Sequence, residues 1–215
     1  MKTSVRAVPV SLMLLGIIVL CPRTAGAQNA APPPKAGNFE IGLFGGESYG
    51  LDRYRPMGGG NVAYGVSRAL YPFAEASYLP GILRDQSIPT GSTAASSRQF
   101  SINMTDFHVG IHVRYPRPES RVIPYAVGGL GLIRGSEGTA TYYNCAPNGV
   151  CDTITGSAPS SVNFAVNFGA GLRFYFNERF AVRMEFKGFK PTSAPAPLDP
   201  ALFFRFAIGP VFQFR

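Results

Sequence analysis

The chain has 215 residues, of which 46% are hydrophobic, with 25 glycines, 17 phenylalanines and no tryptophan. This length suits one membrane barrel or one to two soluble domains of roughly 100–200 residues each. The formal net charge is +8, but the basic residues are scattered singly, which argues against a nucleic-acid-binding protein. No apolar run reaches the ~20 residues of a membrane-spanning helix, so an inner-membrane protein is not expected.

The first element in chain order is a predicted secretory signal peptide, residues 1–27. Its features are Lys2 with Arg6, an apolar run from Val8 to Leu20, and Ala25-Gly26-Ala27 as the cleavage site. Cleavage would start the mature chain at Gln28 and leave a net charge of +5, because three of the positive charges are removed with the signal. The alternative is a lipoprotein acylated at Cys21, although the preceding Leu20 is large for that motif.

A proline-rich periplasmic lead-in is predicted over residues 28–37, followed by a β-barrel domain over residues 38–215. Eight strands are predicted from alternating apolar and polar or small residues. They cover residues 38–46, 58–67, 70–79, 107–115, 122–134, 164–176, 180–187 and 201–214. Short turns alternate with long loops, and the loops are residues 47–57, 80–98, 135–161 and 190–200.

The last strand has the most informative pattern. One parity is wholly apolar, and the other is mostly small or polar; the apolar set is Leu202, Phe204, Phe206, Ile208, Pro210, Phe212 and Phe214. So long an apolar face is typical of a strand with lipid on one side and a polar lumen on the other. The strand at 70–79 leaves its facing open, because Pro72 and Glu75 have opposite parities.

Two segments carry a resemblance to a known family: P-Y-A-V-G-G-L-G-L at 124–132 and G-P-V-F-Q-F at 209–214. With these segments and eight alternating strands, the chain resembles the eight-stranded outer-membrane β-barrel superfamily of the OmpA transmembrane domain, OmpX and the opacity proteins. The expected fold is therefore an all-β, antiparallel, up-and-down transmembrane barrel with both termini in the periplasm. Gly209, Phe212 and Phe214 also resemble the C-terminal signal that the outer-membrane assembly machinery reads.

An aromatic girdle is expected at the periplasmic ends of the strands, made of Tyr115, Tyr175, Phe176, Phe180 and Phe214. An eight-stranded barrel has an interior just wide enough for side chains, which argues against a general porin. The charged residues predicted to face this interior are Glu40, Arg114, Arg173, Arg183, Glu185, Lys187 and Arg205, with Glu75 as a further possibility. We interpret them as a self-neutralising network; a gate for small ions is the alternative.

His108 and His112 point the same way on the strand at 107–115. Residues four apart on a strand are separated by roughly 13 Å, too far to bind one metal ion together. A lipid-modifying enzyme would need a serine or an acid beside one histidine, and the His-x-Ser pairing of such barrel enzymes is missing after both histidines. No catalytic, cofactor or metal site is therefore expected.

The predicted loops hold the remaining candidates. Cys145 and Cys151 are close in sequence in a polar segment of an exported chain, which predicts a disulfide. The first loop carries an aromatic and basic cluster, Tyr49, Arg53, Tyr54 and Arg55. This cluster could bind phosphate or sugar, for example on lipopolysaccharide, or could simply anchor the barrel at anionic headgroups.

The sequence thus predicts a monomeric outer-membrane barrel with a structural or surface-binding, adhesin-like role through its extracellular loops and no enzymatic activity. Its expected partners are outer-membrane lipid and lipopolysaccharide, the assembly machinery and an unidentified surface ligand. A small-solute or ion channel gated by lumenal salt bridges is the alternative, and a lipid-modifying enzyme is a weaker one. An exported soluble β-sandwich is the competing fold.

Overall fold

The computed structural model describes residues 36–51, 54–88, 96–116, 120–146, 148–158, 160–192 and 202–214. The predicted signal peptide, Cys21 and most of the proline-rich lead-in lie outside these residues. In the described part of the chain, no helix is long and apolar enough to cross a membrane.

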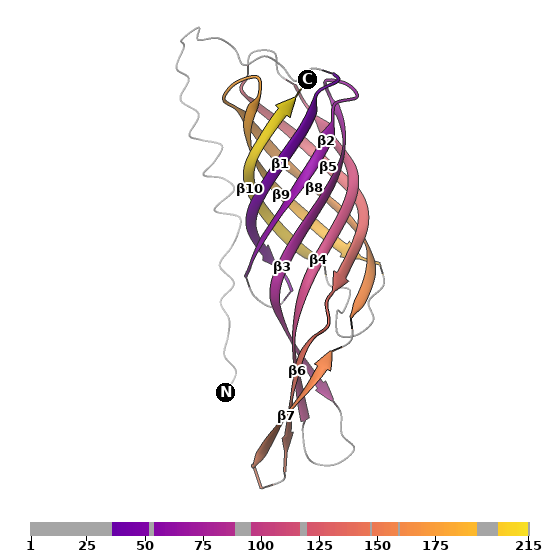
Figure 1. Ribbon diagram of the computed structural model, residues 1–215, viewed down its shortest axis with the longest axis vertical. Coiled ribbons are helices and arrows are strands. Elements are labelled where there is room, and N and C mark those ends of the chain that lie inside the picture. The colour runs from indigo at the N-terminus through magenta and orange to yellow at the C-terminus, as the bar shows by residue number, and fades with distance from the viewer. Residues whose placement is uncertain are drawn as a thin grey trace.

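Eight antiparallel strands close into a barrel (Figure 1). They are β1 (Phe39–Tyr49), β2 (Arg55–Tyr64), β3 (Leu70–Ile88), β4 (Ser96–Arg114), β5 (Val122–Gly135), β8 (Ser161–Tyr175), β9 (Phe180–Pro191) and β10 (Phe203–Phe214). Each pairs with its neighbour in chain order, and β1 pairs with β10 to close the ring. The predicted eight-stranded barrel is therefore confirmed.

Short connections lie at one end of the barrel, which we call the turn end; β10 also finishes there. Side chains close two of these turns. The hydroxyl of Ser67 accepts hydrogen bonds from the amides of Ala69 and Leu70, and Asn177 Oδ1 accepts from the amides of Arg179 and Phe180. Such local acceptors are the reason Ser and Asn favour tight turns.

The opposite end, which we call the hairpin end, differs from the sequence-based expectation. Residues 80–98 and 135–161 were predicted as loops, but much of both is strand. β3 and β4 run on to pair Ile88 with Ser96, and β6 (Gly138–Cys145) with β7 (Cys151–Ala158) forms an additional hairpin. These segments are rich in polar residues, as loops are, because a sheet that lies beyond the membrane needs no lipid-facing apolar side.

β3, β4, β6 and β7 together form a sheet that projects beyond the barrel, in that order (Figure 1). β3 and β4 have 19 residues each, about twice the 9–11 residues that cross a membrane. A register shift between Leu79 and Ile82 marks the exit from the barrel. Gly81 has a φ of 63° there and donates its amide to Asn103 Oδ1 at 2.9 Å. A glycine bulge of this kind bends a strand, so the projecting sheet has a built-in change of direction.

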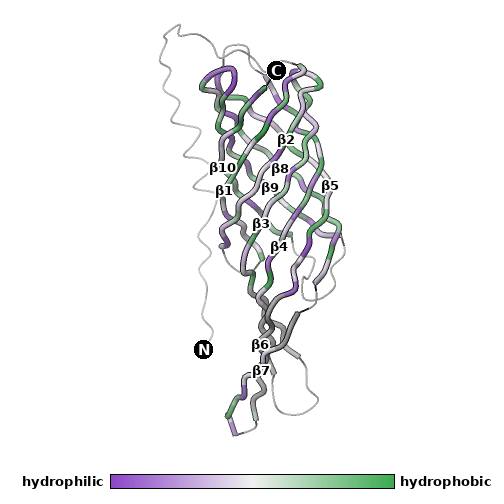
Figure 2. Tube along the Cα trace, viewed as in Figure 1, coloured by the Kyte–Doolittle hydropathy of each residue, from purple (hydrophilic) through white to green (hydrophobic). Residues whose placement is uncertain are grey.

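The barrel strands alternate between an outward apolar face and an inward face, and hydropathy alternates along the tube in Figure 2. On β10 the even positions from Phe206 to Phe214 face outward, and Phe206, Ile208, Phe212 and Phe214 are 45–51% exposed. On β3, Glu75 is buried and Ala76 and Tyr78 face outward, which settles the facing that the sequence left open.

Aromatic side chains gather at both ends of the outward face. Phe174, Phe176, Phe180 and Phe212 form a chain of ring contacts at the turn end with centroid distances of 5.0–5.5 Å. Tyr175 was predicted to belong to this girdle, but it is 2% exposed and points inward. The reason is parity, because Tyr175 lies two residues from the inward-facing Arg173.

A charged substitution at Ile208 tests whether this outward face contacts lipid. It lies near the middle of β10 and is 46% exposed. Ile208→Arg is expected to cost about 2–4 kcal/mol of unfolding free energy, the typical cost of a cation at the bilayer midplane. Urea unfolding in phospholipid vesicles measures this difference. Val150→Arg is the control, since Val150 is 61% exposed in the β6–β7 turn; equal, small effects of both variants would contradict a lipid contact at Ile208.

Candidate functional site

The barrel interior holds a set of ionisable side chains that are almost fully buried. All seven charged residues expected there have a relative exposure of 2% or less: Glu40, Arg114, Arg173, Arg183, Glu185, Lys187 and Arg205. Glu75 and Asp106 join them, each 1% exposed. Charges buried to this degree need partners, so the pairing pattern decides what the interior can do.

Glu40 is the centre of the group near the turn end. Its carboxylate accepts hydrogen bonds from Arg114 at 2.8 and 2.5 Å, from Arg173, and from Gln213 at 2.5 Å. The Arg114 guanidinium also stacks on the Tyr71 ring, 3.3 Å from its centroid. The Glu40 carboxylate thus links β1 to β4, β8 and β10 across the lumen, and Arg114 extends this group to β3 through Tyr71.

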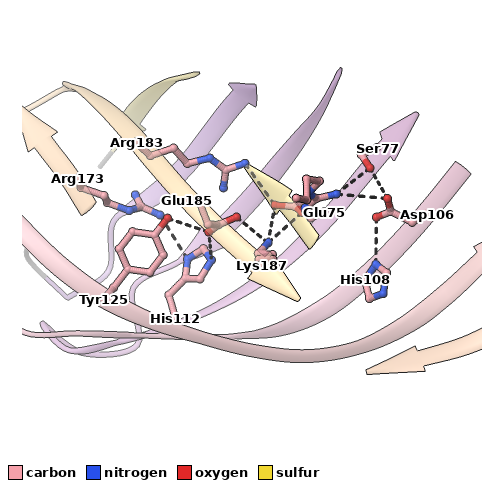
Figure 3. A network of polar contacts seen from close by, with 11 residues as sticks. Glu75, Ser77, Asp106, His108, His112, Tyr125, Arg173, Arg183, Glu185 and Lys187 are labelled. Atoms are coloured by element: carbon pink, nitrogen blue, oxygen red, sulfur yellow. Dashed lines mark hydrogen bonds and ion pairs between the residues drawn. The ribbon is translucent and has the colours of Figure 1, made fainter. Parts of the chain in front are cut away.

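Glu75 is the centre of a second group (Figure 3). Three cations reach it from β9 and β10: Lys187 at 2.9 Å, Arg183 at 3.3 Å, and Arg205. Arg183 lies opposite Arg173 in the register of β8 and β9, but its carboxylate partner is Glu75, whereas Arg173 binds Glu40. The long arginine side chain extends along the lumen to Glu75, and the strand position of Arg183 alone does not predict this contact.

Glu185 links the two groups. It accepts from Tyr125 Oη at 2.8 Å, pairs with Lys187 at 2.8 Å, and lies 3.7 Å from His112 Nε2. His112 in turn lies 3.3 Å from Arg173, which binds Glu40. Polar contacts therefore continue from Glu40 to Glu75 along the lumen, and Figure 3 shows the part from Arg173 to Glu75.

Toward the hairpin end of the lumen, the polar contacts stop at an apolar cluster. Arg205 contacts Asp106 at 3.3 Å, and Asp106 contacts His108 at 3.0 Å. The His108 ring then meets Phe189 edge-on at 5.1 Å. The apolar cluster consists of Phe44, Leu51, Met57, Leu79, Ile82, Ile102, Met104, Ile133, Ala165, Phe189, Phe203 and Ala207. These side chains pack inside the barrel and separate the charged lumen from the projecting sheet.

Ser77, Asp106 and His108 contain the three residue types of a serine hydrolase triad, but their contacts differ from one. Ser77 donates to Asp106 instead of to His108, and His108 Nε2 has no hydrogen-bond partner among the described residues. All three are at most 3% exposed. A serine nucleophile requires the histidine as its base, so this trio does not form the nucleophile and base pair of such an enzyme.

The surface candidates separate in the structure. The Tyr49 and Tyr54 rings contact each other at a centroid distance of 5.3 Å and are more than half exposed. Arg55 starts β2 and is only 9% exposed, because its parity directs it inward. Arg53 lies outside the described residues. The register of β6 and β7 places Cys145 opposite Cys151, which supports the predicted disulfide; that bridge stays a prediction.

Sequence reasoning missed several interior residues that share parity with those it found. Asp106 has the inward parity of His108, and Tyr125, Tyr175 and Gln213 have the inward parity of their strands. Starting the fourth strand at residue 107 hid Asp106. The tyrosines were missed because an aromatic residue suggests an interface, whereas here their hydroxyls bind Glu185 and Gln213.

This fold and interior define the class of protein: a small, closed transmembrane β-barrel with a filled lumen. Residues 12–195 match the family described as outer membrane protein beta-barrel domain. Because the match covers most of the chain, the protein belongs to this family of outer-membrane barrels. No curated protein matches the chain significantly in sequence.

The chain is similar to several solved structures at low sequence identity. Neisserial surface protein A is 7% identical with a TM-score of 0.51, and the match covers 82% of this chain and 96% of that protein. A major outer membrane protein of Thermus thermophilus is 8% identical with a TM-score of 0.50, covering 83% of this chain and 100% of that one. The N-terminal barrel domain of Pseudomonas aeruginosa OprF is 16% identical with a TM-score of 0.47, covering 84% and 100%.

Proposed function

We propose that this protein is a closed outer-membrane barrel that presents the projecting β3–β4–β6–β7 sheet at the cell surface as a binding element. The observation that carries this proposal is the length of β3 and β4, which continue as a paired sheet well beyond the span that a membrane needs. A rigid scaffold carrying an exposed sheet suits recognition of another surface. In this arrangement the turn end faces the periplasm, after export by the signal peptide.

The interior supports a closed barrel as the scaffold. Ion passage would require the Glu75 and Glu185 ion pairs to break and the apolar cluster at the hairpin end to open. Both changes are costly, since a separated buried pair leaves uncompensated charge and an opened cluster exposes apolar surface. The gated channel is therefore the second candidate, favoured only by the unbroken polar contacts between Glu40 and Asp106.

The outward tyrosines support anchoring of the barrel in the outer leaflet. Tyr49, Tyr54 and Tyr78 are exposed toward the hairpin end of the outward face, where interfacial aromatics meet headgroups such as those of lipopolysaccharide. At the turn end, Phe212 and Phe214 stay exposed on β10. We propose that they and Gly209 are read by the assembly machinery during insertion.

Removal of the β6–β7 hairpin tests the binding role. Replacing residues 138–158 by a short Gly-Ser turn is expected to leave a barrel that still migrates differently in unheated and boiled gel samples, because the hairpin contributes no barrel strand. Adhesion of cells that display the shortened protein is expected to fall to background. The assay measures adhesion to epithelial cells, immobilised matrix proteins and immobilised glycans.

The control is a chain of full length in which the hairpin sequence is kept and only the turn residue Val150 is changed to serine. It should bind like the wild type. Equal adhesion of the shortened and complete proteins to every tested surface would contradict the proposal, and discrete conductance steps of the purified barrel in a planar bilayer would favour the channel instead.

A further inference from the structure

We infer that the barrel interior holds one small anion, of the chloride class, at the guanidinium of Arg183. This inference does not depend on what the projecting sheet binds, because it concerns a different part of the molecule. It rests on the hydrogen bonds of Arg183, on the balance of buried charge, and on the residues next to Arg183 in the sheet.

Arg183 has the fewest partners among the buried cations with described contacts. Arg114, Arg173, Arg205 and Lys187 each make at least two polar contacts, and every one of these cations has a carboxylate contact of 2.9 Å or less. Among the described residues Arg183 makes a single hydrogen bond, from Nη2 to Glu75 at 3.3 Å. Its Nε and Nη1 have no hydrogen-bond partner in the same part of the chain, although the side chain is fully buried. Buried guanidinium N–H groups that lack acceptors are unfavourable.

The buried charges around Arg183 do not cancel. Setting aside Arg55 at the hairpin end, the buried cations among the described residues are Arg114, Arg173, Arg183, Lys187 and Arg205, and the buried carboxylates are Glu40, Glu75, Asp106 and Glu185. Five positive groups thus face four negative groups. One monovalent anion would neutralise the interior, and a buried surplus charge is costly without such a partner.

The position of Arg183 in the sheet explains why the surplus positive charge lies at this residue. Arg183 lies directly opposite Arg173 in the register of β8 and β9, and like charges at such cross-strand positions repel each other. Arg173 turns toward Glu40, so Arg183 is left with its one bond to Glu75. The Phe44 ring covers one face of the Arg183 guanidinium, at 4.5 Å from its centroid, which keeps that face away from water.

A second hydrogen-bond donor lies in the same layer. Asn61 pairs in register with Glu75, the residue that Arg183 contacts, and it is 5% exposed. Both atoms of its side-chain amide lack a hydrogen-bond partner among the described residues. Arg183 contacts Glu75 and Asn61 is the cross-strand neighbour of Glu75, so both side chains with unpaired N–H groups are adjacent to the same carboxylate residue. The ligand is a small anion because the interior of an eight-stranded barrel is filled by side chains, and charged N–H donors form strong bonds to anions.

The test measures unfolding by urea in a neutral detergent or in phosphatidylcholine vesicles. Protein refolded in sodium chloride is compared with protein refolded in sodium gluconate at equal ionic strength, because gluconate is too large for the packed interior. The urea midpoint of the wild type is expected to be higher in chloride and to rise with the logarithm of its concentration above the dissociation constant. Sodium phosphate is a third arm, expected to behave like gluconate.

Arg183→Met is expected to remove the difference between chloride and gluconate. Arg179→Gln is the matched control, since Arg179 lies exposed in the turn before the same strand, and it should keep the full difference. A crystal grown in sodium bromide provides a readout that needs no variant: one anomalous peak is expected beside Arg183. Water alone at Arg183 in that crystal, or a chloride effect that survives in Arg183→Met, would overturn the inference.

Discussion

Glu75→Gln is expected to lower the unfolding free energy by about 3–5 kcal/mol, the range for removing one partner of a buried ion pair. The effect is large because Glu75 accepts from Arg183, Lys187 and Arg205 together. Glutamine keeps the shape but not the charge, so three buried cations would share only Glu185 and Asp106. Urea unfolding in vesicles measures the change. The folded fraction is read from the mobility of unheated gel samples, because the chain has no tryptophan for fluorescence.

The control is Glu137→Gln, because Glu137 is exposed after β5 and surface ion pairs contribute about 0–1 kcal/mol. A double variant separates lost charge from lost packing. Glu75→Gln combined with Arg183→Met should recover part of the loss, because Glu75 is the one hydrogen-bond partner of Arg183 among the described residues and the cation left unpaired is then removed. If Glu75→Gln unfolds like Glu137→Gln, the interior network does not hold the barrel together.

Gly209→Ala is expected to destabilise the seam that closes the barrel. A Cβ added at Gly209 would meet the carbonyl oxygen of Leu43 well inside contact distance and the Cα of Phe44 at 2.6 Å. Both atoms belong to the main chain of β1, which pairs with β10 to close the ring, so they cannot rotate away. Overpacking costs about 1–3 kcal/mol in a close-packed interior, and this variant should lie at the upper end.

Gly128→Ala is the matched control for this seam. Gly128 lies on the outward face of β5, and an added Cβ would meet nothing within 4 Å. There alanine should be neutral or slightly stabilising, because it restricts the unfolded chain more than glycine does. Folding yield into vesicles and urea unfolding report both variants. Equal behaviour of the two would show that the close approach at Gly209 is not needed for closure.

Glycine at position 209 can meet two separate requirements, recognition during assembly and close packing of the strands. Sequence resemblance assigns this glycine to an assembly signal, and that role stays a proposal. The structure adds a separate physical need for glycine at the same position, the close approach of β1 and β10. A recognition role predicts a defect in assembly in cells alone, whereas the packing role predicts a defect in purified refolding as well.

The strand pattern was predictable because lipid and lumen impose opposite demands on alternate residues. Phe206 and Ile208 face outward and Arg205 faces inward by parity alone, and the same period locates the other barrel strands. Parity therefore determined the fold class, the strand number of the barrel and most of the inward charges. It could not locate the projecting sheet, because these segments are rich in polar residues and carry no apolar alternation.

Only the tertiary structure decided which inward charges meet. Glu75 gathers cations from β9 and β10, strands distant from it in the sequence, because barrel curvature brings them across the lumen. Arg183 and Arg173 lie opposite each other in the register of β8 and β9, yet their long side chains direct Arg183 to Glu75 and Arg173 to Glu40. The amino-acid order determines the face on which a residue lies; the shear of the strands and the side-chain rotamers determine its partner.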